Sequence, residues 1–140
     1  VEEALDNGIA ISEFPTTMEA ARHASENGML VLMGAPNVVR GGSHSGNISA
    51  LEIAQAGYLG SLSSDYMPVS LLEAAFALSE GGYMSLPAAV GLVTANPAEA
   101  VGLTDRGSLE VGRRADLVRV GMVEGQPVVR NVWREGAEVF

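Results

Sequence analysis

The residues best suited to chemistry gather in one stretch, the segment GAPNVVRGGSHSGN at positions 34–47. An arginine there can present a planar fork of donors to phosphate oxygens, and the glycine-flanked amides before a helix can complete an anion-binding nest. The expected substrate-binding residues are Asn37, Arg40, Ser43, His44, Ser45 and Asn47. A long surface loop with no ligand is the alternative interpretation, and the residues alone leave both open.

Two carboxylates end predicted strands, where parallel α/β folds place their ligands. Asp65 follows an apolar strand and precedes a helix, so it is a candidate general base or metal ligand. The alternative is a turn aspartate that accepts hydrogen bonds from nearby amides. Glu13 also ends an apolar strand, and here the alternative is a solvated carboxylate. His44 is a candidate catalytic acid, because histidine titrates near neutral pH.

Three repeats of strand, loop and helix must position these residues. We expect strands at 8–14, 29–33 and 58–63, followed by helices at 16–27, 48–56 and 69–78. A capping box of Thr16 with Glu19 is predicted to begin the first of these helices. The alternation favours parallel strands joined by right-handed crossovers, and the apolar strands should be covered on both faces.

From residue 85 on, the chain no longer repeats the unit of strand, loop and helix. A helix is expected at 85–94, and Asn96 is expected to cap a short helix that carries Pro97 in its first turn. Short strands are expected at 116–120, 127–133 and 137–140.

Composition excludes several classes of protein. Seventeen acids oppose eight bases, all of them arginine, giving a formal net charge of −9. Such a chain is not expected to bind nucleic acid or an anionic membrane, which require clustered positive charge. The chain has no cysteine, which excludes disulfides and thiolate metal sites, and no apolar run long enough to cross a bilayer. The first residues do not resemble a signal peptide, so a cytoplasmic location is expected.

Four motifs resemble the PhnM-type family of the amidohydrolase superfamily, which belongs to the carbon–phosphorus lyase pathway of phosphonate metabolism. They are EFPTT at 13–17, MGAPN at 33–37, RGGSHSGN at 40–47 and SSDY at 63–66. The later segment GRRADLV at 112–118 resembles the return of an amidohydrolase chain to its small β domain. The resemblance implies a metal-dependent hydrolase that converts α-D-ribose 1-methylphosphonate 5-triphosphate to the 5-phosphate and pyrophosphate.

The same resemblance implies an α/β fold, a (β/α)8 barrel with a small β-sandwich. Residues 1–104 would be the C-terminal part of the barrel, with its sixth to eighth strands, and residues 105–140 would be strands of the sandwich. Asp65 matches the eighth-strand aspartate that binds metal and handles the proton of the attacking water. Glu13 stands where the superfamily often carries a metal-binding histidine, so it is a candidate replacement ligand. The expected cofactor is a divalent metal, with zinc as the first choice.

A barrel of this type needs about 250 residues. We therefore expect the chain to be the C-terminal part of a longer enzyme, with the first half of the barrel supplied by missing sequence or by a second chain. The fragment alone is expected to be inactive and to bind metal incompletely, and homo-oligomer formation is left open. Two other functions stay open: another amidohydrolase reaction, such as cyclic amide hydrolysis or deacetylation, and a noncatalytic assembly domain that retains half a fold.

Overall fold

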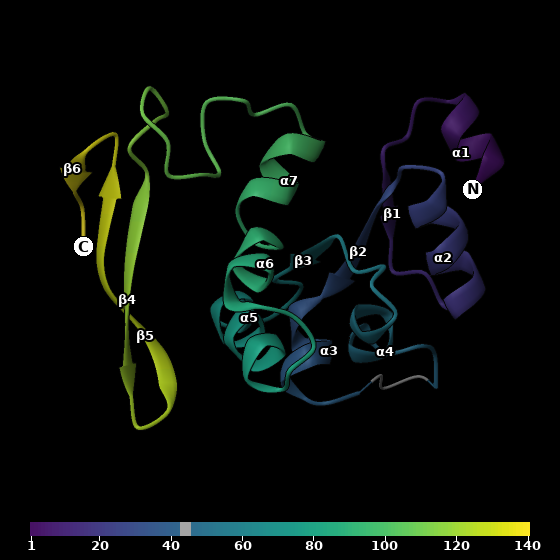
Figure 1. Cartoon of the computed structure of the whole chain (residues 1–140), viewed down its shortest axis with the longest axis horizontal. Coiled ribbons are helices and arrows are strands. Elements are labelled where there is room, and N and C mark those ends of the chain that lie inside the picture. Colours follow the sequence, from purple (N-terminus) through teal and green to yellow (C-terminus); the bar gives the residue numbers. More distant parts are fainter. Residues whose placement is uncertain (43–45) are drawn as a thin grey trace.

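The computed structural model describes residues 1–42 and 46–140. Within the first hundred residues, three strands are separated by helices and followed by three consecutive helices (Figure 1). The elements are α1 (Glu2–Asp6), β1 (Ile11–Glu13), α2 (Met18–Glu26), β2 (Leu30–Gly34), α3 (Ala35–Val39), α4 (Ala50–Gln55), β3 (Ser61–Ser63), α5 (Ser70–Glu80), α6 (Leu86–Gly91), α7 (Ala95–Ala100), β4 (Leu117–Val123), β5 (Gln126–Arg134) and β6 (Ala137–Glu138). The α/β class is confirmed, although the first and third strands are shorter than expected.

The first three strands form a parallel sheet in the order β1-β2-β3. Glu13 lies opposite Leu32, and Gly34 lies opposite Ser63. Since side chains alternate between faces along a strand, the buried Val31 and Met33 point to the opposite face from these residues. One face of the sheet therefore carries the buried side chains of Val31 and Met33, and the other face carries Glu13.

The apolar face is covered by short helices. Val31, Met33 and Leu62 join a core that includes Ile53 of α4 and Leu78 of α5, both fully buried. Helix α2 packs against β2, and α3 packs against α4 and α5. Many core positions are alanine, which lets helices of only one to three turns lie close to the sheet and to each other.

Side-chain caps at Thr17, Ser49 and Ser85 fix where three of the helices begin. Helix α2 starts at Thr17, whose hydroxyl accepts a hydrogen bond from the Ala20 amide at 3.1 Å. The predicted cap at Thr16 is therefore wrong by one residue. Helix α4 starts at Ser49 with a complete capping box, because Glu52 accepts from the Ser49 amide at 2.8 Å. The Ser49 hydroxyl and amide hold the pKa of Glu52 below its usual value.

Two local predictions differ from the structure in ways that matter for the site. The segment expected to be one long loop begins with helix α3, because Pro36 suits a first helical turn and Ala35, Pro36 and Val38 are buried. Asn96 lies inside α7 rather than at its cap, and its side-chain nitrogen donates to the Gly60 carbonyl at 2.8 Å. This hydrogen bond attaches α7 to the start of β3.

The last three strands form a separate antiparallel sheet in the order β4-β5-β6, which contacts the first part of the chain where β5 meets α5 (Figure 1). Glu124 and Gly125 join β4 to β5, and Glu135 and Gly136 join β5 to β6. All four have positive φ values between 50° and 82°. This backbone matches type I′ hairpin turns, whose twist suits antiparallel strands.

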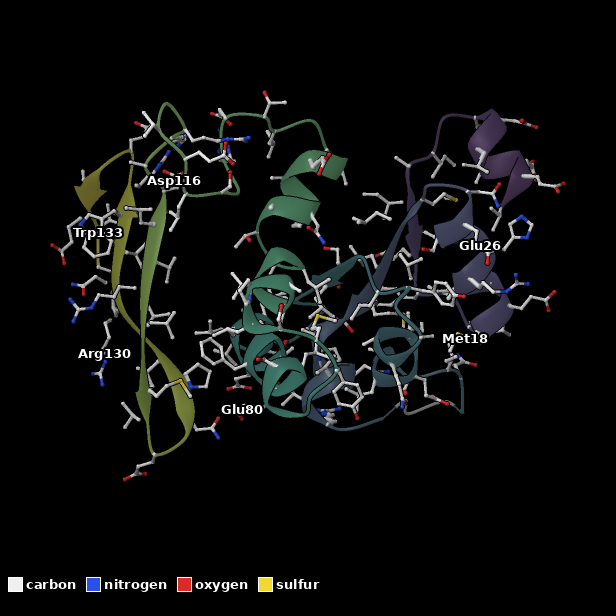
Figure 2. All side chains as sticks on the ribbon, viewed as in Figure 1. Met18, Glu26, Glu80, Asp116, Arg130 and Trp133 are labelled. Carbon is white, nitrogen blue, oxygen red and sulfur yellow. The ribbon has the colours of Figure 1, made fainter. Side chains whose placement is uncertain are left out.

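An ion-pair cluster connects the second of these turns to the segment before β4. Asp116, labelled in Figure 2, accepts from the Glu135 amide at 2.9 Å. Arg114 lies 2.7 Å from the Asp116 carboxylate and 2.9 Å from that of Glu135. The Glu135 amide, followed by the Arg114 guanidinium, lowers the pKa of Asp116.

The lowered pKa of Asp116 predicts a pH dependence of stability. Its contribution is complete above the unfolded-state pKa of about 4 and is lost as the pH falls through the lower folded-state pKa. We expect Asp116→Asn to melt at a lower temperature than the parent at pH 7, with the difference shrinking below about pH 4. Thermal unfolding followed by circular dichroism between pH 7 and pH 3 measures this. A constant difference across that range would contradict it.

Among the described residues, none of the helices is both long and apolar enough to span a bilayer.

Candidate functional site

The carboxyl ends of β1, β2 and β3 lie along one edge of the parallel sheet, and three residues meet there. A Cβ atom placed on Gly34, the last residue of β2, would lie 3.3 Å from Oδ2 of Asp65 and 3.4 Å from Cε1 of Phe14. Phe14 follows β1 directly, and Asp65 lies two residues beyond β3. We call these three residues the strand-end cluster. Each of the three parallel strands thus contributes one member to it.

The backbone of the strand-end cluster is unusual. Phe14 and Asp65 have φ values of 51° and 49°, in the left-handed region that side chains other than glycine rarely adopt. Glu124 and Glu135 are the other described non-glycine residues with positive φ, and tight hairpin turns account for both. No hairpin accounts for Phe14 or Asp65. Such strained residues cluster at functional sites, where the surrounding structure holds them in place.

An arginine from the segment after β2 contacts the residue next to this cluster. The guanidinium carbon of Arg40 is 5.3 Å from the centre of the Tyr66 ring, and Tyr66 immediately follows Asp65. Both residues are exposed. Cation–π contact at this distance orients the guanidinium over the ring. The structure therefore links the segment after β2 to the loop after β3, at the residue that follows Asp65.

The other predicted substrate ligands have different surroundings. Asn37 lies in α3, and its side-chain oxygen accepts from the Ala50 amide at 2.9 Å, so it caps α4. Any contact of Asn37 with substrate would thus fall to its side-chain nitrogen. Asn47 is exposed just before α4. Ser43, His44 and Ser45 lie outside the described residues, and their roles stay predictions.

The second predicted metal ligand, Glu13, is exposed at the end of β1 on the same face as Gly34. Adjacent strands lie about 4.8 Å apart, so β1 and β3 are separated by roughly 10 Å. Asp65 and Glu13 supply the oxygen donors that a divalent metal accepts. In residues 1–42 and 46–140, however, no group of three histidine, aspartate or glutamate side chains could hold a metal ion. These residues therefore fit part of a metal site and do not complete one.

Comparison with known proteins assigns the chain to a family. The model of the family described as "Amidohydrolase family" matches residues 8–140. The chain belongs to the amidohydrolase family. The match spans both the parallel sheet and the antiparallel strands, so the two sheets are parts of one amidohydrolase sequence.

The relatives of this amidohydrolase chain are longer than the chain itself. It is 53% identical over 142 residues to "Alpha-D-ribose 1-methylphosphonate 5-triphosphate diphosphatase" from Escherichia coli strain K12, and it spans 38% of that protein's length. Among solved structures, an adenine deaminase matches 86% of the chain with a TM-score of 0.59 and 18% identity. An amidohydrolase from Thermotoga maritima MSB8 matches 99% of the chain with a TM-score of 0.59 and 19% identity. These matches cover 38% and 45% of the solved chains and bear on the fold alone.

Sequence reasoning did not single out three residues of the site. Gly34 and Phe14 lie within the quoted motifs, but nothing in the sequence shows that they would meet at Asp65. Tyr66 follows Asp65 directly, and its contact with Arg40 requires the two loops to lie side by side. The sequence signals available were a glycine ending an apolar strand and aromatic residues beside two strand-end carboxylates.

Proposed function

We propose that the complete protein containing this chain is a metal-dependent phosphoanhydride hydrolase that releases pyrophosphate from α-D-ribose 1-methylphosphonate 5-triphosphate. The observation that carries this proposal is the 53% identity, along the whole chain, to the Escherichia coli enzyme of that name. The position of Asp65 and Arg40 on loops that follow adjacent strands supports it.

The reaction defines what the site must do. Release of pyrophosphate from a 5-triphosphate, leaving the 5-phosphate, requires cleavage between the α and β phosphates. The oxygen of water forms a new bond to phosphorus, the bridging P–O bond breaks, and pyrophosphate leaves with its electron pair. The site therefore needs an acceptor for the water proton and cationic or amide donors for the polyphosphate.

The described residues can divide these tasks between two loops. Asp65 accepts the proton of the attacking water, and together with Glu13 it would hold a divalent metal, for which zinc is our proposal. When bound, such a metal lowers the pKa of water and polarises a phosphoryl oxygen. Arg40, held against Tyr66, binds phosphate oxygens through its planar fork. Asn37 and Asn47, with the undescribed Ser43, His44 and Ser45, are proposed as further phosphate ligands, and His44 as the acid that protonates the leaving pyrophosphate.

We further propose that the chain is the C-terminal part of a (β/α)8 barrel, residues 1–104, followed by strands of a small sandwich, residues 105–140. Within the described residues, β1 and β3 each pair with a neighbour on one side only. Apolar side chains on β4 and β5, such as Val118 and Val128, are exposed. Open strand edges and exposed apolar faces are what remains of a fold when the covering elements lie elsewhere.

The test is an assay of the complete protein, expressed from its natural reading frame with zinc. We expect stoichiometric pyrophosphate release from the ribose triphosphate. We expect no comparable turnover of an N-acetylated sugar or a cyclic amide, because neither carries the anions that Arg40 binds. Turnover of an amide without pyrophosphate release would instead favour the alternative amidohydrolase chemistry.

A further inference from the structure

We infer that Gly34 is a positioning residue that leaves space for the Asp65 carboxylate, with the Phe14 ring bounding the same space. This role rests on the proposed function of Asp65. The observation is the contact geometry of the strand-end cluster. Gly34 is buried at the end of β2, and the space where its side chain would lie is bounded by the Asp65 carboxylate and the Phe14 ring.

Backbone conformation does not require glycine at position 34. Gly34 has φ −73° and ψ 127°, an ordinary extended conformation that any L-residue adopts. Glycine weakens a strand, because it loses more conformational freedom on folding and packs no side chain. The local advantage of glycine at position 34 is therefore the space that it leaves between its neighbours.

The neighbours leave no room for a methyl group without a shift. At 3.3 Å, a Cβ atom on residue 34 would be tighter against Asp65 Oδ2 than nine in ten real Cβ contacts, and the carboxylate would have to give by a few tenths of an ångström. The ladder between β2 and β3 restrains the backbone at Gly34, so most of the adjustment would fall on the Asp65 side chain. The edge of the Phe14 ring, 3.4 Å from the same Cβ position, limits how far residue 34 itself can move.

The left-handed backbone at Phe14 and Asp65 indicates that the surrounding structure holds both residues in place beside Gly34. Each conformation is costly and is kept only where surrounding structure enforces it. Phe14 is bound to the sheet through its amide, which donates to the Leu32 carbonyl at 2.9 Å. The edge of its ring and the Asp65 carboxylate both border the space beside Gly34.

The test is a double-mutant cycle in the complete protein, with pyrophosphate release from the ribose triphosphate as the readout. Gly34→Ala should lower kcat about tenfold, since a misplacement of about 1 Å can cost about 10²-fold and the shift here is a few tenths of an ångström. KM should change less than about twofold, and the melting temperature should not fall. In the Asp65→Asn background, Gly34→Ala should lower kcat no further, because the carboxylate it displaces is already gone.

The second part of the test asks whether a second substitution restores the kcat lost in Gly34→Ala. Phe14→Leu replaces the ring with a shorter side chain and gives residue 34 space to move away from Asp65. Combined with Gly34→Ala, it should recover kcat relative to Gly34→Ala alone. Gly91→Ala is the matched control: Gly91 has an ordinary φ, ends α6, and a Cβ there would lie 3.4 Å from Asn96 Oδ1. Its kcat should equal that of the parent.

Three results would overturn the inference. They are an unchanged kcat in Gly34→Ala, an equal loss from Gly34→Ala in the parent and in the Asp65→Asn background, and a kcat loss that matches the fraction unfolded. Failure of the proposed function itself looks different. In that case the parent releases no pyrophosphate, or Asp65→Asn retains full turnover, whatever Gly34→Ala does.

Discussion

Asp65→Asn should leave the complete protein folded and remove nearly all of its turnover. A positioned proton acceptor contributes about 10²–10⁴-fold to a rate, and the amide of asparagine cannot take up the proton of water at neutral pH. Asparagine is the informative replacement, because it has almost the shape of aspartate and tolerates the left-handed backbone found at this position. Alanine would add backbone strain, so a lower kcat could then come from that strain as well as from the missing carboxylate.

The measurement is kcat for pyrophosphate release, with the melting temperature of the same preparation as a check on folding. Asp6→Asn is the matched control, because Asp6 is an exposed carboxylate at the end of α1, away from the strand-end cluster. It should have parental kcat. A folded Asp65→Asn protein with near-parental kcat would show that Asp65 is a turn residue, as the alternative interpretation of the sequence holds.

Arg40→Ala should raise KM for the triphosphate by about 10- to 100-fold, with a smaller effect on kcat. A hydrogen bond to a charged group contributes about 1.5–3 kcal/mol, and each ~1.4 kcal/mol corresponds to tenfold in affinity. Arg40→Lys should recover only part of this loss, because an ammonium cannot bind two phosphate oxygens as a planar fork. Tyr66→Phe should keep the parental KM, since it retains the ring beneath the guanidinium.

Steady-state kinetics across the series separates a phosphate ligand from a general charge effect. Arg22→Ala removes the same charge from an exposed position on α2, where Arg22 pairs with Glu26 at 3.0 Å. It should leave KM unchanged. If Arg22→Ala and Arg40→Ala raise KM equally, the effect is a long-range one, in which loss of either positive charge increases the repulsion between the acidic chain and the anionic substrate. If neither changes KM, the segment after β2 does not bind the polyphosphate.

The two substitutions separate chemistry from binding on neighbouring loops. Loss of the Asp65 carboxylate should act mainly on kcat, whereas loss of the Arg40 fork should act mainly on KM. The contact between Arg40 and Tyr66 joins the loops physically, since Tyr66 is the residue after Asp65. A modest kcat effect of Arg40→Ala would therefore be consistent with the geometry.

Local sequence patterns determined most of the elements, because they depend on forces within a few residues. Apolar runs placed β1, β2 and β3, and the glycines at 8, 28 and 57 ended helices with positive φ. Motif resemblance pointed to the amidohydrolase family, and the family match over residues 8–140 confirms it. Caps were less certain, since neighbouring threonines at 16 and 17 have equivalent side chains and only the entry angle of the chain selects Thr17.

Tertiary structure alone decided what meets at the carboxyl ends of the strands. Phe14, Gly34 and Asp65 lie far apart in the sequence, and only the parallel register of β1, β2 and β3 makes them neighbours. Sequence could suggest Asp65 as a functional residue, but not the glycine that leaves space for its carboxylate. Helix α3 and the role of Asn37 as a cap of α4 likewise depend on packing against α4 and α5. Patterns along a chain record what each residue prefers, whereas the shape of a site depends on contacts between residues that the chain brings together only on folding.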